Sequence, residues 1–273
     1  MTVSTWLTAH GEDLQVLLFF GGLAVLAVAE RLAPRRATGD RRRRWLTNYA
    51  LTALNLVVLM ALPVTLIGSA AWAQDRGWGL FNRLALPAGI AVVATLLVRA
   101  FVSFATHWLM HKVPVLWRFH RVHHLDTELD VSTTVRFHPL ESVLALGPGV
   151  ALVVAFGLSP WVLIGYELLD VAVTLFSHAN LRLPPAVDRV LRYLIVTPDL
   201  HRIHHSSWQP ETDSNFGAVF PVWDLVFGTY RATPRDGHER MRLGLDEVRG
   251  REAHRLFWLL GSARHRRLAP GAR

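Results

Sequence analysis

The chain has 273 residues, of which 51% are hydrophobic and 18% charged, and its mean hydropathy of +0.27 is typical of a membrane protein. It contains no cysteine, which excludes disulfides, iron–sulfur clusters and thiolate-bound haem or zinc, so any metal must be held by nitrogen and oxygen atoms. The net charge of +8 comes almost entirely from arginine beside apolar segments, which indicates a membrane surface rather than a nucleic acid as the partner.

The first apolar run, residues 14–33, is long enough to cross a hydrocarbon core of about 30 Å as a helix. We interpret it as an uncleaved membrane helix. A cleaved signal peptide is the alternative, because the Ala-Val-Ala at 27–29 resembles a cleavage site, but the basic cluster follows the run instead of preceding it. The arginines between 35 and 44 place this loop in the cytoplasm and the N-terminus outside the cell.

Further apolar runs predict membrane segments at 48–73 and 86–110, joined by a short non-cytoplasmic link. A long apolar stretch at 143–177 is interrupted by Gly-Leu-Ser-Pro at 157–160, which predicts a hairpin that either crosses the membrane or re-enters it. The ends of these segments that carry histidine therefore return to the cytoplasmic side. The sequence predicts an all-α integral membrane protein with about four helical crossings.

The remaining residues, 111–142 and 178–273, predict a cytoplasmic helical cap followed by a basic tail. The tail at 246–268 alternates arginine with large apolar residues, as an amphipathic helix lying on anionic lipid does. A solvated basic tail that packs on the cap is the alternative. We expect an integral protein of the bacterial inner membrane.

Histidine forms the most informative pattern in the sequence. One pair is spaced i and i+4 and two triplets are spaced i, i+3 and i+4, so each set shares a helical face, while adjacent members diverge by about 100°. Each neighbour in a triplet can therefore serve a different metal. Two more histidines bring the candidates to ten: His107, His111, His120, His123, His124, His138, His178, His201, His204 and His205.

So many neutral imidazoles packed without a cation would leave polar atoms unpaired, which predicts a metal site. Ten ligand nitrogens exceed the usual coordination number of one ion, so we expect two metals. The ligands do not identify the metal, because imidazole suits iron, zinc, copper and nickel alike. The absence of His-Glu-x-x-His and Glu-x-x-His argues against a zincin protease and a ferritin-type centre. Seven carboxylates could accept hydrogen bonds from the imidazole N–H groups that face away from the metals, or could instead form ordinary salt bridges with arginine. They are Asp126, Glu128, Asp130, Glu141, Asp199, Asp213 and Asp224. Expected at the surface are His10, His238, His254 and His265.

The ordered motifs HWLMH, HRVHH, RFHPLE, HAN, TPDLHRIHH, DSNFG and WDLVFGTYR, over about residues 90–231, resemble the sterol desaturase and fatty acid hydroxylase superfamily. The resemblance implies a di-iron centre, with zinc as a possible substitute, that uses O2 to hydroxylate or desaturate a lipid. It assigns ligand motifs to all ten candidates except His138, whose ligand role it leaves open. Arg182 stands where some members carry another histidine, so water, Asn180 or His138 would complete one metal.

Such an oxidation needs electrons, and the chain has no GxGxxG fingerprint. We therefore expect a separate electron-donor protein, ferredoxin-like or cytochrome-like, on the basic cytoplasmic face. The lipid substrate would enter between spans, past Phe104, Trp108, Leu109 and Leu175. Two alternatives remain at this stage: a zinc-dependent membrane hydrolase, which would work without O2, and a metal-handling membrane protein.

Overall fold

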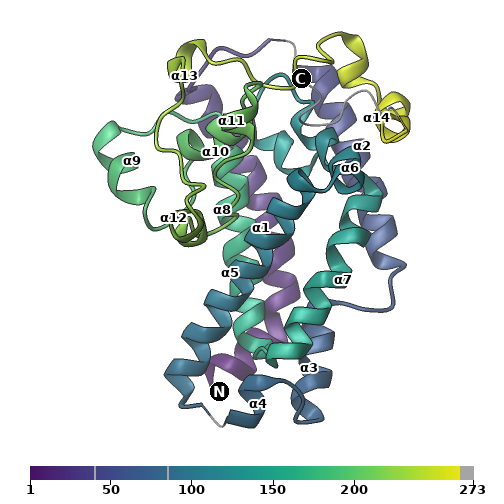
Figure 1. Ribbon diagram of the computed structural model, residues 1–273, viewed down its shortest axis with the longest axis vertical. Coiled ribbons are helices and arrows are strands. Elements are labelled where there is room, and N and C mark those ends of the chain that lie inside the picture. Colours follow the sequence, from purple (N-terminus) through teal and green to yellow (C-terminus); the bar gives the residue numbers. More distant parts are fainter. Residues whose placement is uncertain (40, 85, 265–273) are drawn as a thin grey trace.

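The computed structural model describes residues 1–39, 41–84 and 86–264. Within these residues every regular element is a helix, and the only β-type pairs are two isolated bridges. Figure 1 shows long helices standing side by side along the long axis of the molecule, with most of the short helices gathered at one end. We call this end the cap and define it as residues 113–138 and 179–264. The all-α prediction is confirmed.

Four helices are long and apolar enough to cross a membrane: α1 (Val3–Leu32), α5 (Ala88–Lys112), α7 (Pro139–Phe156) and α8 (Pro160–His178). This number matches the prediction, and α7 and α8 form the expected hairpin. Its turn depends on Gly157, which ends α7 with a φ of 65°, in the left-handed region that glycine adopts without strain. A Cβ atom there would also lie 2.7 Å from the carbonyl oxygen of Trp78, so the site admits no side chain.

The predicted segment 48–73 is not one continuous helix. The chain forms α2 (Arg41–Met60), a turn at 61–65, α3 (Leu66–Asp75) and then the short α4 (Leu80–Leu84). Pro63 explains the break, because proline lacks the N–H that an α-helix needs and disfavours helical geometry at the residue before it. Thr65 then caps α3 by accepting a hydrogen bond from the N–H of Gly68 (2.9 Å).

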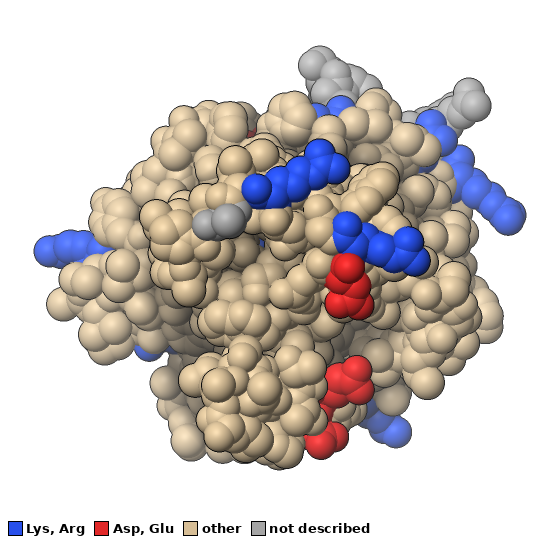
Figure 2. Space-filling view, turned by 90° about the horizontal axis from the view of Figure 1, so that it is seen from below, with Lys and Arg blue, Asp and Glu red and all other residues tan. Residues whose placement is uncertain are grey.

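The long helices pack closely, with α1 lying along α8 and with α5 contacting α7 and α8. Gly11 on α1 permits this approach, because a Cβ atom there would lie 2.4 Å from Cγ2 of Ile164 on α8. The N-terminus and the cap lie at opposite ends of the molecule (Figure 1). Figure 2 shows the end remote from the cap, where few charged side chains interrupt a mainly uncharged surface.

The cap consists of short helices, none of which, among the described residues, is long enough to cross a membrane. They are α6 (Pro114–His124), η1 (Val131–Val135), α9 (Pro185–Leu191), α10 (Pro198–His204), α11 (Gln209–Thr212), α12 (Val222–Phe227), α13 (Gly237–Arg240), η2 (Arg251–His254) and α14 (Leu256–Ser262).

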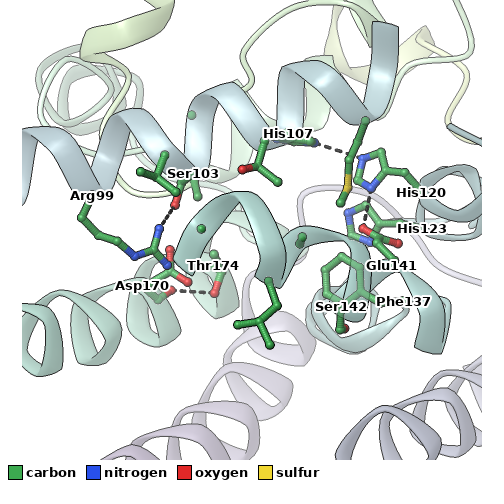
Figure 3. A pocket seen from close by; sticks show the side chains of 18 of the residues that line it. Arg99, Ser103, His107, His120, His123, Phe137, Glu141, Ser142, Asp170 and Thr174 are labelled. Atoms are coloured by element: carbon green, nitrogen blue, oxygen red, sulfur yellow. Dashed lines mark hydrogen bonds and ion pairs between the residues drawn. The ribbon is translucent and has the colours of Figure 1, made fainter. Parts of the chain in front are cut away.

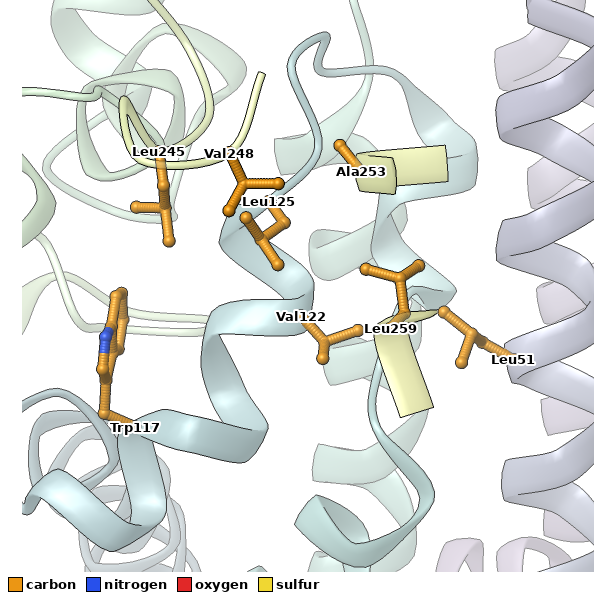
Figure 4. Packing of buried hydrophobic residues seen from close by; sticks show 8 residues of the cluster. All are labelled: Leu51, Trp117, Val122, Leu125, Leu245, Val248, Ala253 and Leu259. Carbon is orange, nitrogen blue, oxygen red and sulfur yellow. The ribbon is translucent and has the colours of Figure 1, made fainter. Parts of the chain in front are cut away.

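An apolar cluster fastens the C-terminal segment to the cap (Figure 4). Its buried members are Leu51, Trp117, Val122, Leu125, Leu245, Val248, Ala253 and Leu259. Leu259 on α14 is fully buried in this cluster, whereas Phe257 is 86% exposed, so α14 packs on its neighbours with one face and exposes an apolar side chain on the other. The rest of the predicted amphipathic helix, residues 265–268, lies outside the described residues.

The arginine loop also belongs to the cap end. Arg44, at the start of α2, is buried and contacts Asp126 (2.7 Å) and Asp130 (2.9 Å), which follow α6. Although burial by itself lowers the pKa of an arginine, these two carboxylates raise the pKa of Arg44 above its ordinary value. The loop between α1 and α2 and the cap therefore form one structural unit.

Candidate metal centre

Two short cap helices, α6 and α10, carry the histidine triplets. Each begins with a proline in its first turn, where the missing N–H costs no helical hydrogen bond, and each ends at its histidines. Thr197 also caps α10, accepting from the N–H of Leu200 (3.4 Å) while its hydroxyl donates to Asp188 (2.6 Å). The two triplets are therefore held at helix ends that point into the interior of the protein.

The structure brings nine of the ten candidate histidines together in two groups. The five-histidine group consists of His107, His111, His120, His124 and His204. The four-histidine group consists of His123, His178, His201 and His205. Within each group the nitrogens that could bind a metal all lie within 4.8 Å of one another, and eight of the nine side chains are buried.

The adjacent histidines of each triplet separate between the groups, as their helical geometry predicts. His123 belongs to the four-histidine group and His124 to the five-histidine group, while His204 and His205 divide in the opposite sense. Helix α6 thus gives two side chains to one group and one to the other, and α10 does the reverse. Both groups thus draw on α6 and α10, while α5 adds His107 and His111 to one group and α8 adds His178 to the other.

The spacing of the ring nitrogens matches that of ligands bound to one metal ion. The Nε2 atoms of His178 and His201 are 3.0 Å apart, and those of His107 and His120 are 3.1 Å apart. Two nitrogens bound at right angles to an ion, at metal–nitrogen distances of about 2.1 Å, would be separated by about 3 Å. The observed distances are those expected of ligands that share an ion.

Unpaired polar atoms support the same interpretation. Neither ring nitrogen of His111 has a hydrogen-bond partner, and Nε2 of His204 has none, although these atoms are shielded from solvent. Burial lowers the pKa of His204 to about 3 and, with repulsion from neighbouring histidines, lowers the pKa of His205 well below its ordinary value. Neutral imidazoles with free lone pairs are what a metal requires, so the residues present fit a pair of metal ions.

Carbonyl oxygens fix which nitrogen of several rings is free. The Nδ1–H groups of His107, His178 and His204 donate, each over 2.8 Å, to the carbonyl oxygens of Phe216, Thr174 and Ser214. A carbonyl can only accept, so Nδ1 carries the proton and Nε2 keeps the lone pair. These contacts hold the rings in the orientation that metal binding needs.

One of the predicted carboxylates hydrogen-bonds to an imidazole, and a second lies near one without forming a hydrogen bond. Glu141 on α7 accepts from Nδ1 of His120 (2.7 Å), and Asp213 lies 3.5 Å from Nδ1 of His111. Asp224 acts one step further away, because it accepts from the N–H groups of Phe216 (2.7 Å) and of the residue after it. It thereby positions the Phe216 carbonyl that holds His107.

The other predicted carboxylates form ordinary ion pairs. Asp126, Glu128 and Asp130 contact Arg44, and Asp199 contacts Arg35 (2.9 Å). Of the histidines expected at the surface, His10 is exposed, His238 and His254 are partly buried, and His265 lies outside the described residues.

The structure does not bring His138 to either group. Its Nδ1 accepts from the N–H of Leu140 (3.1 Å) at the start of α7, and its Nε2 contacts the carbonyl oxygen of Leu260 (3.2 Å). Both nitrogens are therefore engaged by the main chain, which leaves no lone pair for a metal. Asn180 is engaged too, since its amide contacts Arg36 and Arg202. Neither residue is available to complete the four-histidine group.

A cavity of about 380 Å³ connects the histidines to the interior between α5, α7 and α8 (Figure 3). Its histidine end includes His107 and His120 of one group and His123, His178 and His201 of the other. Apolar residues such as Met110 and Leu146 line the walls.

The apolar residues expected along the lipid path, Phe104, Trp108, Leu109 and Leu175, are not among those lining this cavity. Trp108 is 39% exposed on the outside of α5, and Phe104 stacks on Phe227. The interpretation from sequence also missed Arg99 and Asp170 at the other end of the cavity. The available signal was a charged residue in the middle of an apolar span, which is rare without a function.

Comparisons with known proteins agree with this site. The family model described as fatty acid hydroxylase matches residues 92–229, which include all nine grouped histidines. An ornithine lipid hydroxylase of Rhizobium tropici is 26% identical over 238 residues, which are 83% of this chain and 71% of that protein.

Other relatives match a smaller part of their own length. A very-long-chain aldehyde decarbonylase of Oryza sativa subsp. indica is 27% identical over 222 residues, 77% of this chain and 32% of that protein. An alkylglycerol monooxygenase of Caenorhabditis elegans is 26% identical over 141 residues, 50% of this chain and 26% of that protein. No solved structure gives a significant match.

Proposed function

The chain belongs to the fatty acid hydroxylase family, and on this premise we propose that it uses O2 to oxidise a C–H bond of a membrane lipid, by hydroxylation or desaturation. One observation carries the proposal: two groups that together hold nine histidines, eight of them buried, meet at the end of a cavity lined by membrane-spanning helices. A relative named as an ornithine lipid hydroxylase supports the lipid as substrate class.

We assign the five-histidine and four-histidine groups as the ligands of two iron ions, which zinc could replace. Bound iron would supply the activation of O2 that oxidation of an unactivated C–H bond requires, since no protein side chain is a strong enough oxidant. The four-histidine group offers one ligand fewer, and with Asn180 and His138 engaged elsewhere, water is the remaining candidate to complete it.

The residues of the chain position and shield this chemistry. Glu141 and the three carbonyl oxygens orient the imidazoles, and the burial of the rings keeps bulk water from the oxidising site. The cavity gives a lipid chain a path toward both groups, because histidines of each group line the same end. Met110 and Leu146 provide the apolar surface that a hydrocarbon chain needs.

We also propose the orientation and the partner. The arginine loop lies at the cap end, and arginine-rich loops stay in the cytoplasm, so the cap and the metal centre face the cytoplasm and the N-terminus lies outside. In this proposal the host is the bacterial inner membrane. Electrons come from a separate ferredoxin-like or cytochrome-like protein that docks on the cap surface. A second cavity there is lined by the arginines Arg35, Arg182, Arg189 and Arg192 and by the carboxylates Asp188, Asp199 and Glu239.

The test is to express the chain and a His205→Ala variant, and to compare membrane lipids from aerobic and anaerobic cells by mass spectrometry. We expect a lipid product of higher oxygen content or unsaturation only with the unchanged chain and only with O2. A product formed equally without O2, with zinc as the bound metal, would identify a membrane hydrolase instead. Absence of any product with two irons bound and a competent electron donor present would refute the oxidase.

A further inference from the structure

A polar cluster lies in the middle of the membrane-spanning bundle, away from the histidines. Arg99 on α5 donates through Nε to Glu167 on α8 (2.8 Å) and contacts the hydroxyl of Ser103 (2.5 Å). Its guanidinium also lies over the ring of Tyr166, 4.9 Å from the centroid. Asp170 on α8 lies at the same end of the cavity (Figure 3).

The Arg99–Glu167 pair is explained by its role in joining α5 to α8, but this role does not explain Asp170. One cation and one carboxylate suffice to join α5 to α8, and Glu167 does not line the cavity. Asp170 adds a second carboxylate, lines the cavity, and has an oxygen, Oδ1, that is shielded from solvent and without a hydrogen-bond partner. Arg99 attracts Asp170 as well as Glu167, but it makes no hydrogen bond to this oxygen. Each charged residue at the centre of a span costs about 3 kcal/mol to insert, so a carboxylate oxygen without a hydrogen-bond partner there indicates a ligand.

The polar cluster lies at a fixed distance from the histidines along the helices. Asp170 precedes His178 by eight residues on α8, and Arg99 precedes His107 by eight residues on α5. At 1.5 Å per residue, the polar cluster lies about 12 Å from the histidines along both helices. Figure 3 shows Arg99 and Asp170 at one end of the cavity and His107, His120 and His123 at the other.

On α8, the wall between the two ends offers little competition for a polar group. The hydroxyl of Thr174 donates to the carbonyl oxygen of Asp170 (2.6 Å), and that of Ser177 donates to the carbonyl oxygen of Thr174 (3.2 Å). These hydroxyl protons are already used within α8. On the opposite side, Ala145, Leu146 and Gly149 of α7 are apolar.

We propose that Asp170 binds a hydrogen-bond-donating group of the lipid, a hydroxyl, amide or amine, about 12 Å from the carbon that is oxidised. The binding follows from the cavity alone, whereas the fixed distance to an oxidised carbon rests on the proposed function. Asp170 is on this proposal a binding residue that selects the substrate and sets the position of oxidation.

Binding is tested without O2, with purified metal-loaded protein in detergent, by the shift of its thermal unfolding midpoint with lipid concentration. The probes are hexadecanol and hexadecyl methyl ether, which differ in the hydroxyl donor. We expect the unchanged protein to bind the alcohol about tenfold more tightly or better, the usual effect of one hydrogen bond to a buried charged group. Equal affinities would overturn the proposal.

Variants locate the effect. Asp170→Leu should abolish the preference for the alcohol, and Asp170→Asn, which keeps an acceptor oxygen, should retain part of it. Glu167→Gln is the matched control, because Glu167 belongs to the same cluster but does not line the cavity, and it should keep the preference. If Asp170→Leu does not fold, the test rests on Asp170→Asn. The assignment is contradicted if Asp170→Asn prefers the alcohol as strongly as the unchanged protein does. It is also contradicted if Glu167→Gln loses as much of the preference for the alcohol as Asp170→Asn loses.

Turnover separates this proposal from the proposed function. With O2 and electrons, the oxidised carbon should stay at a constant distance from the hydroxyl when hexadecanol is replaced by octadecanol. Oxidation at a constant distance from the methyl end would overturn the positioning role. If no probe or native lipid is oxidised while alcohol binding still depends on Asp170, the oxidase fails and the binding site stands.

Discussion

The rings of His124 and His205 stack with their centroids 4.6 Å apart and their planes inclined by 21°, although the two residues belong to different histidine groups. The two histidine groups are therefore in direct contact. Because α6 and α10 each supply both groups, a displacement of either helix changes the ligands of both metals. The two histidine groups therefore form one structural unit.

This construction predicts the effect of removing single ligands. His204→Ala removes a ligand from the five-histidine group and His205→Ala one from the four-histidine group, so each should lower the metal content from about two ions per chain and abolish O2-dependent turnover. Elemental analysis of purified protein measures the stoichiometry. His10→Ala, at an exposed position of α1, is the control and should keep both properties. Full metal and full turnover in folded His205→Ala would contradict the two-group assignment.

His138 should behave differently from the nine grouped histidines. As the residue that caps α7, it contributes to folding, so His138→Ala should lower the free energy of unfolding by about 1 kcal/mol, while His138→Asn, a good capping residue, should lose less. Metal content should not change in either variant. Thermal unfolding and elemental analysis on the same samples test this, and loss of one ion in His138→Asn would show that His138 is a ligand.

Glu141 should affect metal affinity through His120. Glu141→Ala removes the acceptor that orients the imidazole, and we expect metal affinity to fall by about 10-fold to 100-fold. Glu141→Gln keeps an oxygen acceptor and should lose less. Competition with a chelator measures both. Glu239→Ala, which removes an exposed carboxylate, is the control, and an equal loss there would mean that the effect is not local.

Asp224 should couple loop stability to metal binding. Asp224→Ala leaves the N–H groups of Phe216 and Gly217 without an acceptor, which should cost about 3 kcal/mol of stability. It should also weaken metal binding, because the Phe216 carbonyl that holds His107 loses its support. The control is Asp246→Asn, an exposed ion pair expected to change stability by less than about 0.5 kcal/mol. Unchanged metal affinity in Asp224→Ala would show that the carbonyl does not need this support.

The absence of cysteine allows a direct test of orientation. Ala37→Cys lies in the exposed arginine loop, and Gln74→Cys lies at the opposite end of the molecule. With the cap in the cytoplasm, a membrane-impermeant thiol reagent added to intact cells should label Gln74→Cys and leave Ala37→Cys unlabelled until the cells are broken. The reverse pattern would place the cap outside.

The sequence predicted the division of the histidines because that division depends on local geometry. On a helix, His123 and His124 must point in directions about 100° apart whatever surrounds them. The hairpin was predictable for the same reason, since Gly157 marks a turn through its own conformational preference. Which histidines of different helices share a group, such as His107 and His204, is visible only in the fold.

Sequence patterns were least informative where a single residue or a tertiary contact determines the structure. Hydropathy averaged over 48–73 concealed Pro63, which breaks the helix. His138 belongs to a histidine-containing motif, but its role depends on main-chain partners at Leu140 and Leu260, the second of which is far away in sequence. Asp170 was overlooked because its significance depends on a cavity that only the folded bundle encloses.

The cluster that joins α14 to α6 affects when the centre can form. Val122, between the histidines of α6, packs in the same core as Leu259, which is 137 residues later in the chain. During synthesis, His120, His123 and His124 therefore leave the ribosome long before α14 completes the apolar core around their helix. We expect a polypeptide truncated before α14 to carry all nine grouped histidines and yet to retain metal less firmly than the whole chain.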